Sequence, residues 1–144
     1  MEEPKREGAV EPREVVRRFV EEYQEKRDPA AFEEFLSPDV VDHTPMPGTA
    51  GGAEGVRQIF GMLWSALPDM HVEVHDQIAE GDKVVTYKSF AGTHEGELFG
   101  VPATGKAVHL DLIDIVRVQG GKIVEHWNIV DAYGLMQQMG ALSS

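Results

Sequence analysis

The sequence contains no cysteine. This absence excludes disulfide bonds, thiolate catalysis and cysteine-ligated metal sites. No apolar run approaches the roughly 20 residues that a transmembrane helix needs. The polar start of the chain lacks the apolar region of a signal peptide. We therefore expect a cytoplasmic protein.

Basic residues are scarce. The chain has 13 Lys and Arg against 25 Asp and Glu, a net charge of −12. The excess of acidic residues is spread along the chain. Residues 1–36 contain 7 basic and 11 acidic residues, and residues 37–144 contain 6 basic and 14 acidic residues. Such a surface repels nucleic acid and anionic membranes. Neither a Gly-x-Ser-x-Gly nucleophile motif nor a glycine-rich phosphate loop occurs.

The length of 144 residues is that of one domain. We expect a frayed N-terminal segment over 1–11 and a single domain over 12–144. Apolar residues at helical spacing predict helices over 12–28, 29–36 and 54–67, and a short helix or cap over 133–142.

Alternation of apolar and polar residues predicts strands over 70–79, 83–93, 107–118 and 122–131, and a short extended stretch over 40–44. Helices followed by antiparallel strands indicate the α+β class, with helices on one face of a curved sheet. A pocket between the two layers is the expected place for a small apolar ligand.

Several segments, in order, resemble the SnoaL-like polyketide cyclase (ester cyclase) family of the nuclear transport factor 2-like superfamily. They are Val41-Asp42-His43, Leu67-Pro68-Asp69 and the segments 79–85, 92–100, 103–106, 121–127 and 134–140. The resemblance implies a cone of helices and curved sheet around an apolar pocket. It also implies an intramolecular aldol condensation of a polyketide ester, without metal or cofactor. The family's base, an aspartate on the last strand, corresponds to Asn128, where this chain departs from the pattern.

The last hairpin can pair in two registers, which place different side chains together. A three-residue loop, Gln119 to Gly121, pairs 118 with 122, whereas a two-residue loop, Gly120-Gly121, pairs 118 with 123. We favour the three-residue loop. It sets Asp114 opposite His126, with Asn128 one step along on the same apolar face.

These three residues are the predicted catalytic group. Apolar neighbours and mutual attraction favour an Asp114–His126 pair that titrates near neutrality and moves a proton. The Asn128 amide can donate a hydrogen bond to an enolate oxygen. A buried pair that only fixes the sheet register is the alternative.

His43 is a candidate second acid or base at the pocket mouth, or else only a turn contact of Asp42. Further residues are expected to line the pocket, although core packing would also account for most of them. They are Tyr23, Met46, Phe60, Trp64, His94, Phe99 and Leu112.

A metal site has little support. His71 and His75 have the spacing of a helical zinc site, but they fall in a predicted strand, where four residues span roughly 13 Å. His109, Asp111 and His126 could form a two-histidine, one-carboxylate set only in the two-residue register. We expect neither a metal nor another cofactor.

The sequence therefore favours cofactor-independent cyclisation, isomerisation or dehydration of a small apolar carbonyl compound. An epoxide hydrolase or dehydratase on the same scaffold is one alternative. A non-catalytic ligand-binding module is another, because Asn128 replaces the family's base. Apolar residues on the far face, Ile113, Ile115, Trp127 and Ile129, predict a homodimer through the outer face of the sheet.

Overall fold

The computed structural model describes residues 11–142, so the expectation for 1–11 lies almost wholly outside the described residues. The helices are α1 (Pro12–Arg18), the π-helix η1 (Phe19–Glu25), α2 (Pro29–Phe35), α3 (Gly52–Ala66) and α4 (Ala132–Gln138). The strands are β1 (Leu36–Asp42), β2 (His71–Glu80), β3 (Lys83–Thr93), β4 (Ala107–Gln119) and β5 (Lys122–Val130).

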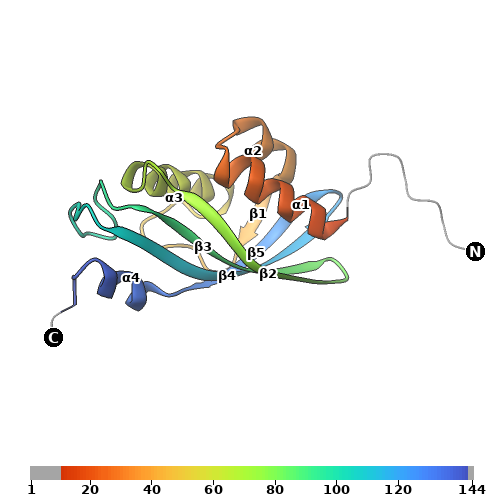
Figure 1. The fold of residues 1–144 in the computed structure, drawn as a ribbon. Helices are drawn as coiled ribbons and strands as arrows, with labels where there is room; N and C mark the ends of the chain where they lie inside the picture. Colours follow the sequence, from red (N-terminus) through yellow and green to blue (C-terminus); the bar gives the residue numbers. More distant parts are fainter. Residues whose placement is uncertain (1–10, 143–144) are drawn as a thin grey trace, which may run out of the picture.

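The five strands form one curved sheet in the order β1-β5-β4-β3-β2. β1 pairs with β5 in parallel, and the other neighbours are antiparallel. Helices α1 to α3 cover one face, the inner face, while the opposite outer face is left open (Figure 1). The hydrophobic core fills the space between the helices and the inner face. The predicted α+β class is confirmed.

No helix within the described part of the chain is long and apolar enough to span a membrane.

The first helix changes its winding midway. It continues from α1 into η1, and the wider turns of η1 bury Tyr23 and Gln24 side by side. Asp28 ends this segment and caps α2 by accepting the N–H of Ala30 at 2.9 Å. π-helical turns often occur at functional sites, and here the consequence is a polar side chain, Gln24, aimed into the core.

β1 is longer than the extended stretch predicted over 40–44. It begins at Leu36, directly after α2, and its parallel pairing sets Asp42 beside His126. A hydrogen bond of 2.9 Å from the backbone N–H of His43 to the carbonyl of His126 continues this contact. The sequence pattern did not indicate this parallel pairing.

The favoured three-residue register of the last hairpin is wrong. Gln119 pairs with Lys122 around a two-residue turn in which both glycines have left-handed backbones, with φ of 60° and 76°. One step on, the register shifts by a residue, so that Arg117 pairs with Glu125 and Val124 is the extra residue of a bulge.

This bulge decides which side chains share the inner face. Asp114 pairs with Asn128, not with His126, and His126 pairs with Val116. The two-residue turn alone would have sent His126 to the outer face, since a one-residue slip reverses a strand. Because the bulge reverses it back, Asp114, His126 and Asn128 do lie on one face, as expected, although for a different reason.

Candidate active site

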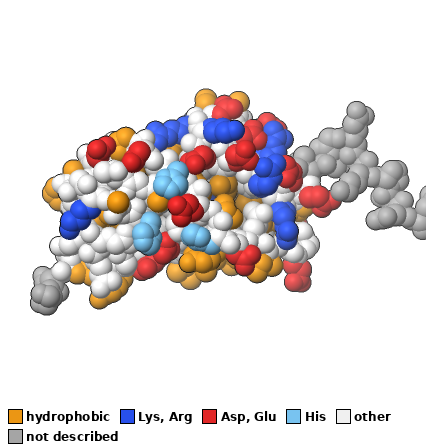
Figure 2. Space-filling model, in the orientation of Figure 1, with side chains coloured by type: hydrophobic (Ala, Val, Ile, Leu, Met, Phe, Trp, Pro, Cys, Tyr) orange, Lys and Arg blue, Asp and Glu red, His pale blue; other side chains and the backbone are white. Residues whose placement is uncertain are grey.

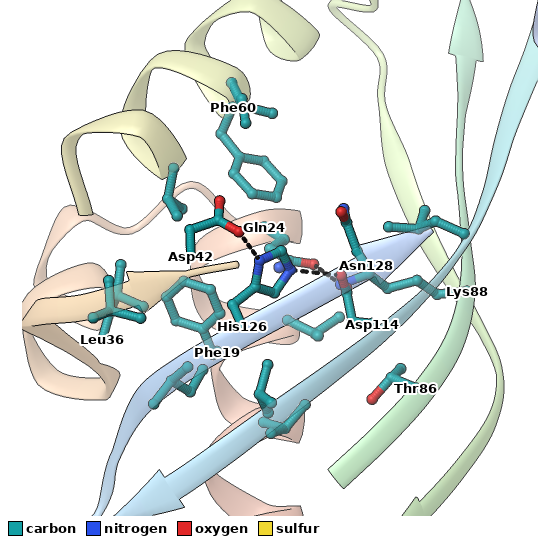
Figure 3. Close-up of a pocket in the computed structure, with 18 of the residues that line it drawn as sticks. Phe19, Gln24, Leu36, Asp42, Phe60, Thr86, Lys88, Asp114, His126 and Asn128 are labelled. Atoms are coloured by element: carbon teal, nitrogen blue, oxygen red, sulfur yellow. Dashed lines mark hydrogen bonds and ion pairs between the residues drawn. The ribbon is translucent and has the colours of Figure 1, made fainter. Parts of the chain in front are cut away.

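A cavity lies between the inner face of the sheet and the helices (Figure 3). Its inner chamber, of about 100 Å³, is lined mainly by apolar side chains from α1, η1, α3 and the strands. A wider mouth of about 380 Å³ adjoins it. The two share the wall residues Asp42, Ile59, Phe90, Leu112, His126 and Asn128. The combined space is of the size in which proteins bind small organic ligands.

His126 is held between two carboxylates on the wall of this cavity (Figure 3). Its Nδ1 lies 3.1 Å from Oδ1 of Asp42, and its Nε2 lies 2.8 Å from Oδ1 of Asp114. Asp42 comes from β1 and Asp114 from β4, so the ring bridges the strands on either side of β5. The imidazole is fixed in orientation by both nitrogens.

Lys88, which the sequence reasoning missed, completes the group. Its Nζ lies 2.6 Å from Oδ2 of Asp114 and donates to Oε1 of Gln24 at 3.0 Å. Lys88 is only 2% exposed. Its inward position could have been predicted from the sequence. On β3, the buried residues Val84, Thr86 and Phe90 alternate with outward residues, and Lys88 falls on the same alternation as the buried ones.

Mutual attraction sets the charges of this group. Burial acts to raise the pKa of Asp114, but the Lys88 ammonium and the hydrogen bond from His126 hold it far below its ordinary value. Burial likewise acts to raise the pKa of Asp42, yet His126 keeps it low. Burial acts to lower the pKa of His126, but the hydrogen bonds to Asp114 and Asp42 raise it to about 9.

At neutral pH the cavity wall therefore carries two carboxylates balanced by an imidazolium and an ammonium. The expectation that the Asp114–His126 pair titrates near neutrality is wrong, because it did not include Lys88 or Asp42. The balance of charge explains how four ionised groups can persist beside apolar side chains.

Asn128 lines both chambers. The hydroxyl of Thr44 accepts the backbone N–H of Asn128 at 2.8 Å and donates to its Oδ1 at 3.0 Å. The side-chain Nδ2 has no hydrogen-bond partner among residues 11–142. An oriented amide N–H next to an apolar cavity can bind a ligand oxygen.

His43 does not line the cavity, so its predicted place at the pocket mouth is wrong. Its ring stacks on Trp127 with 4.4 Å between centroids, and its Nε2 lies 3.0 Å from Glu125. Side chains alternate along a strand, and in β1 this alternation sends Asp42 inward and the following residue outward. The segment Val41-Asp42-His43 therefore contributes Asp42 to the cavity wall, although Asp42 was not among the predicted site residues.

The predicted lining residues divide into two groups. Phe60 lines the inner chamber, Met46 and Phe99 line the mouth, and Leu112 lines both. Tyr23, Trp64 and His94 line neither chamber.

The three residues outside the cavity have structural contacts. Tyr23 packs against Trp64 at 5.3 Å between centroids, in an aromatic cluster behind the chamber wall. His94 is fully buried, and its Nδ1 lies 2.9 Å from Oγ1 of Thr104. This contact ties together the two ends of the loop between β3 and β4.

The alternative metal ligands do not come together. His109 and Asp111 lie on the outer face, 2.8 Å apart, whereas His126 lies on the inner face. Figure 2 shows histidine and acidic side chains side by side on one surface of the molecule. His71, His75, His109 and Asp111 line an open hollow. Within the part of the chain that the structure describes, no group of three or more His, Asp or Glu has the arrangement of a metal site.

The fold and sequence have close parallels among known proteins. The chain is 30% identical over 131 residues to the aklanonic acid methyl ester cyclase DnrD of Streptomyces peucetius, covering 88% of each chain. The crystal structure of IdmH from Streptomyces antibioticus superposes with a TM-score of 0.80 at 32% identity, covering 91% of this chain and 99% of IdmH. TsrD of Streptomyces laurentii gives a TM-score of 0.79 at 30% identity, covering 97% of this chain and all of TsrD (100%).

The family model described as SnoaL-like polyketide cyclase matches residues 14–139, which is nearly all of the described fold. Its match includes both carboxylates, the histidine between them and the strands that carry them. The chain belongs to the SnoaL-like polyketide cyclase family.

Proposed function

We propose that this protein catalyses a cofactor-independent, enolate-forming reaction on a small, largely apolar carbonyl compound, best described as the intramolecular aldol cyclisation of a polyketide ester. The observation that carries the proposal is the hydrogen-bonded series Asp42–His126–Asp114 on the wall of an apolar cavity. The ester cyclases among its relatives support the same reaction class.

The first step needs a base that can reach a carbon next to a carbonyl group. Asp114 has no free carboxylate oxygen to act as the base, because Lys88 contacts its Oδ2 and His126 contacts its Oδ1. Asp42 has no lysine partner within the described chain and lines both chambers. Asp42 therefore accepts the proton from the substrate carbon.

The electron pair of the broken C–H bond then forms an enolate, whose oxygen needs a hydrogen-bond donor. The Asn128 amide supplies it, since Asn128 lines both chambers, its Oδ1 is held by Thr44, and its Nδ2 has no hydrogen-bond partner among residues 11–142. Preorganised donors of this kind are among the largest contributions to enzyme catalysis. In this role an amide serves better than a carboxylate, which accounts for Asn at the position of the family's aspartate.

The enolate carbon attacks the second carbonyl group of the same molecule, and the new alkoxide takes a proton from the His126 imidazolium. Asp42 returns its own proton to His126 across their 3.1 Å contact. The proton moves in this direction because the neutral imidazole is the stronger base: the pKa of His126 is raised to about 9, whereas that of Asp42 is lowered. The cycle closes without net gain or loss of protons or electrons, so it requires no cofactor.

Turnover of aklanonic acid methyl ester and nogalonic acid methyl ester, the compounds named in the relatives' descriptions, tests the proposal. We expect the wild-type protein to cyclise at least one of them, and His126→Gln to lose 10²–10⁴-fold in rate, as is typical for a general acid–base residue. Conversion of neither ester, with binding of both, would instead support the non-catalytic binding module.

A further inference from the structure

The loop between β3 and β4 holds an aromatic residue in an unfavourable backbone position. Leu98 and Val101 exchange two backbone hydrogen bonds of 3.0 and 2.9 Å around a two-residue turn. Its central residues, Phe99 and Gly100, have φ of 48° and 80°. Turns with two left-handed residues favour Asn, Asp or Gly, because an L side chain there crowds its own backbone.

The position of this turn is fixed by its surroundings. Leu98 is 1% exposed and anchors the turn in the core. The backbone N–H groups of Glu95 and Gly96 both donate to the carbonyl of Ala66, at 2.9 and 3.1 Å. Gly96 approaches Ser65 so closely that an added Cβ would lie 2.8 Å from its carbonyl oxygen. The loop is thus fastened to the end of α3.

Leu98 is the fully buried residue of this turn, whereas Phe99 is only partly buried against the core. Its ring is half-buried and lines the mouth, together with Met46 and Pro47 of the loop that follows β1. Strained backbone positions of this kind persist where the rest of the fold determines them, often at ligand sites.

We propose that Phe99 is a specificity-determining residue whose ring forms the outer wall of the ligand site. The inner chamber, of about 100 Å³, is near the size of a single ring. A larger ligand must therefore extend into the mouth and contact Phe99. The inference rests on the proposed function only in taking the cavity as a ligand site.

Two unreactive probes of different size test this assignment. Phenol fits within the inner chamber, whereas 1,8-dihydroxyanthraquinone has to extend into the mouth. Phe99→Asn preserves the turn, since Asn-Gly is the favoured sequence for two left-handed residues. We expect this variant to raise the Kd of the anthraquinone about tenfold, by loss of aromatic contact, and to change the Kd of phenol less than twofold.

Arg27→Asn is the matched control. Arg27 is the other non-glycine residue with a left-handed backbone in the described chain, at φ 61°, and it lines neither chamber. It should leave both Kd values unchanged.

The assignment is overturned if Phe99→Asn weakens both probes equally or neither, if Arg27→Asn has the same effect, or if the wild-type protein does not bind the anthraquinone. Because no turnover is measured, selective loss of anthraquinone binding would support Phe99 even if neither ester is cyclised.

Discussion

Asp42 and His126 lie directly opposite each other where β1 pairs in parallel with β5, and their side chains meet at 3.1 Å. The two residues are 84 positions apart in the chain. This pairing brings a second carboxylate to a histidine that already contacts Asp114. It turns a simple ion pair into a series that can take up and return a proton.

The protonation state of His126 follows from this arrangement. Its pKa is raised to about 9 from 6.5, so its charged form stabilises the folded protein. That contribution, on the order of 3 kcal/mol, is complete below about pH 6.5 and is lost as the pH rises through about 9. We expect ring-nitrogen NMR to show both nitrogens protonated at pH 7.5. Unfolding in urea should show a loss of stability between pH 7 and 10 that is missing in His126→Gln. A midpoint of titration near 6.5 would contradict this.

The contribution of the two carboxylates to the stability of the fold depends on pH in the opposite direction. The pKa values of Asp42 and Asp114 are lowered, so their contribution to stability is present above about pH 4 and is lost as the pH falls further. The contributions of His126, Asp42 and Asp114 to stability are therefore complete together only between about pH 4 and pH 6.5.

Lys88 should be essential for stability only while Asp114 is charged. Lys88→Met leaves a buried carboxylate with one partner fewer, which typically costs about 3–5 kcal/mol. Replacing Asp114 by Asn in the same chain removes that charge. We expect the double variant Lys88→Met, Asp114→Asn to be more stable in urea than Lys88→Met alone. Additive losses would show that the two residues are not coupled.

Asn128→Asp distinguishes an amide donor from a lost base. A carboxylate beside the developing enolate oxygen repels it and adds a third negative charge next to Asp114, with which residue 128 pairs. We expect kcat for the ester substrates to fall by 10²-fold or more, a typical loss for one oxyanion donor. A gain in kcat would show instead that this chain lacks the family's base at that position.

The outer face of the sheet remains the predicted surface for a homodimer. Ile113 and Ile129 are 46% and 80% exposed there, and clustered exposed apolar residues often mark interfaces. We expect light scattering to give twice the mass of the 15.9 kDa chain and Ile129→Glu to give the monomer mass. A monomeric wild-type protein would remove this prediction.

The sequence predicted best those helices and strands that follow from the spacing of apolar residues within one short segment. The helix predicted over 54–67 is α3, Gly52–Ala66, and each of the four main strands lies within a few residues of its predicted range. Asp114, His126 and Asn128 were placed on one face correctly although the assumed hairpin register was wrong, because the bulge at Val124 restores that facing.

The remainder of the site depends on contacts between distant segments. Asp42 was passed over for the neighbouring His43 because the facing of β1 is set only when it pairs with β5, some 80 residues further along. The bulge at Val124 has no local signature, since no glycine or proline marks it. Lys88 could have been found from its inward position among Val84, Thr86 and Phe90, whereas its partner Gln24 depends on the winding of η1.

Exchange of substrate hydrogen tests the central claim most directly. In deuterium oxide, a protein that forms the enolate should introduce deuterium at the carbon next to the carbonyl group of aklanonic acid methyl ester, as followed by NMR. We expect exchange with the wild-type protein and a loss of 10²-fold or more in Asp42→Asn, with the ester still bound. Exchange at the wild-type rate in Asp42→Asn would contradict the role of Asp42 as the base.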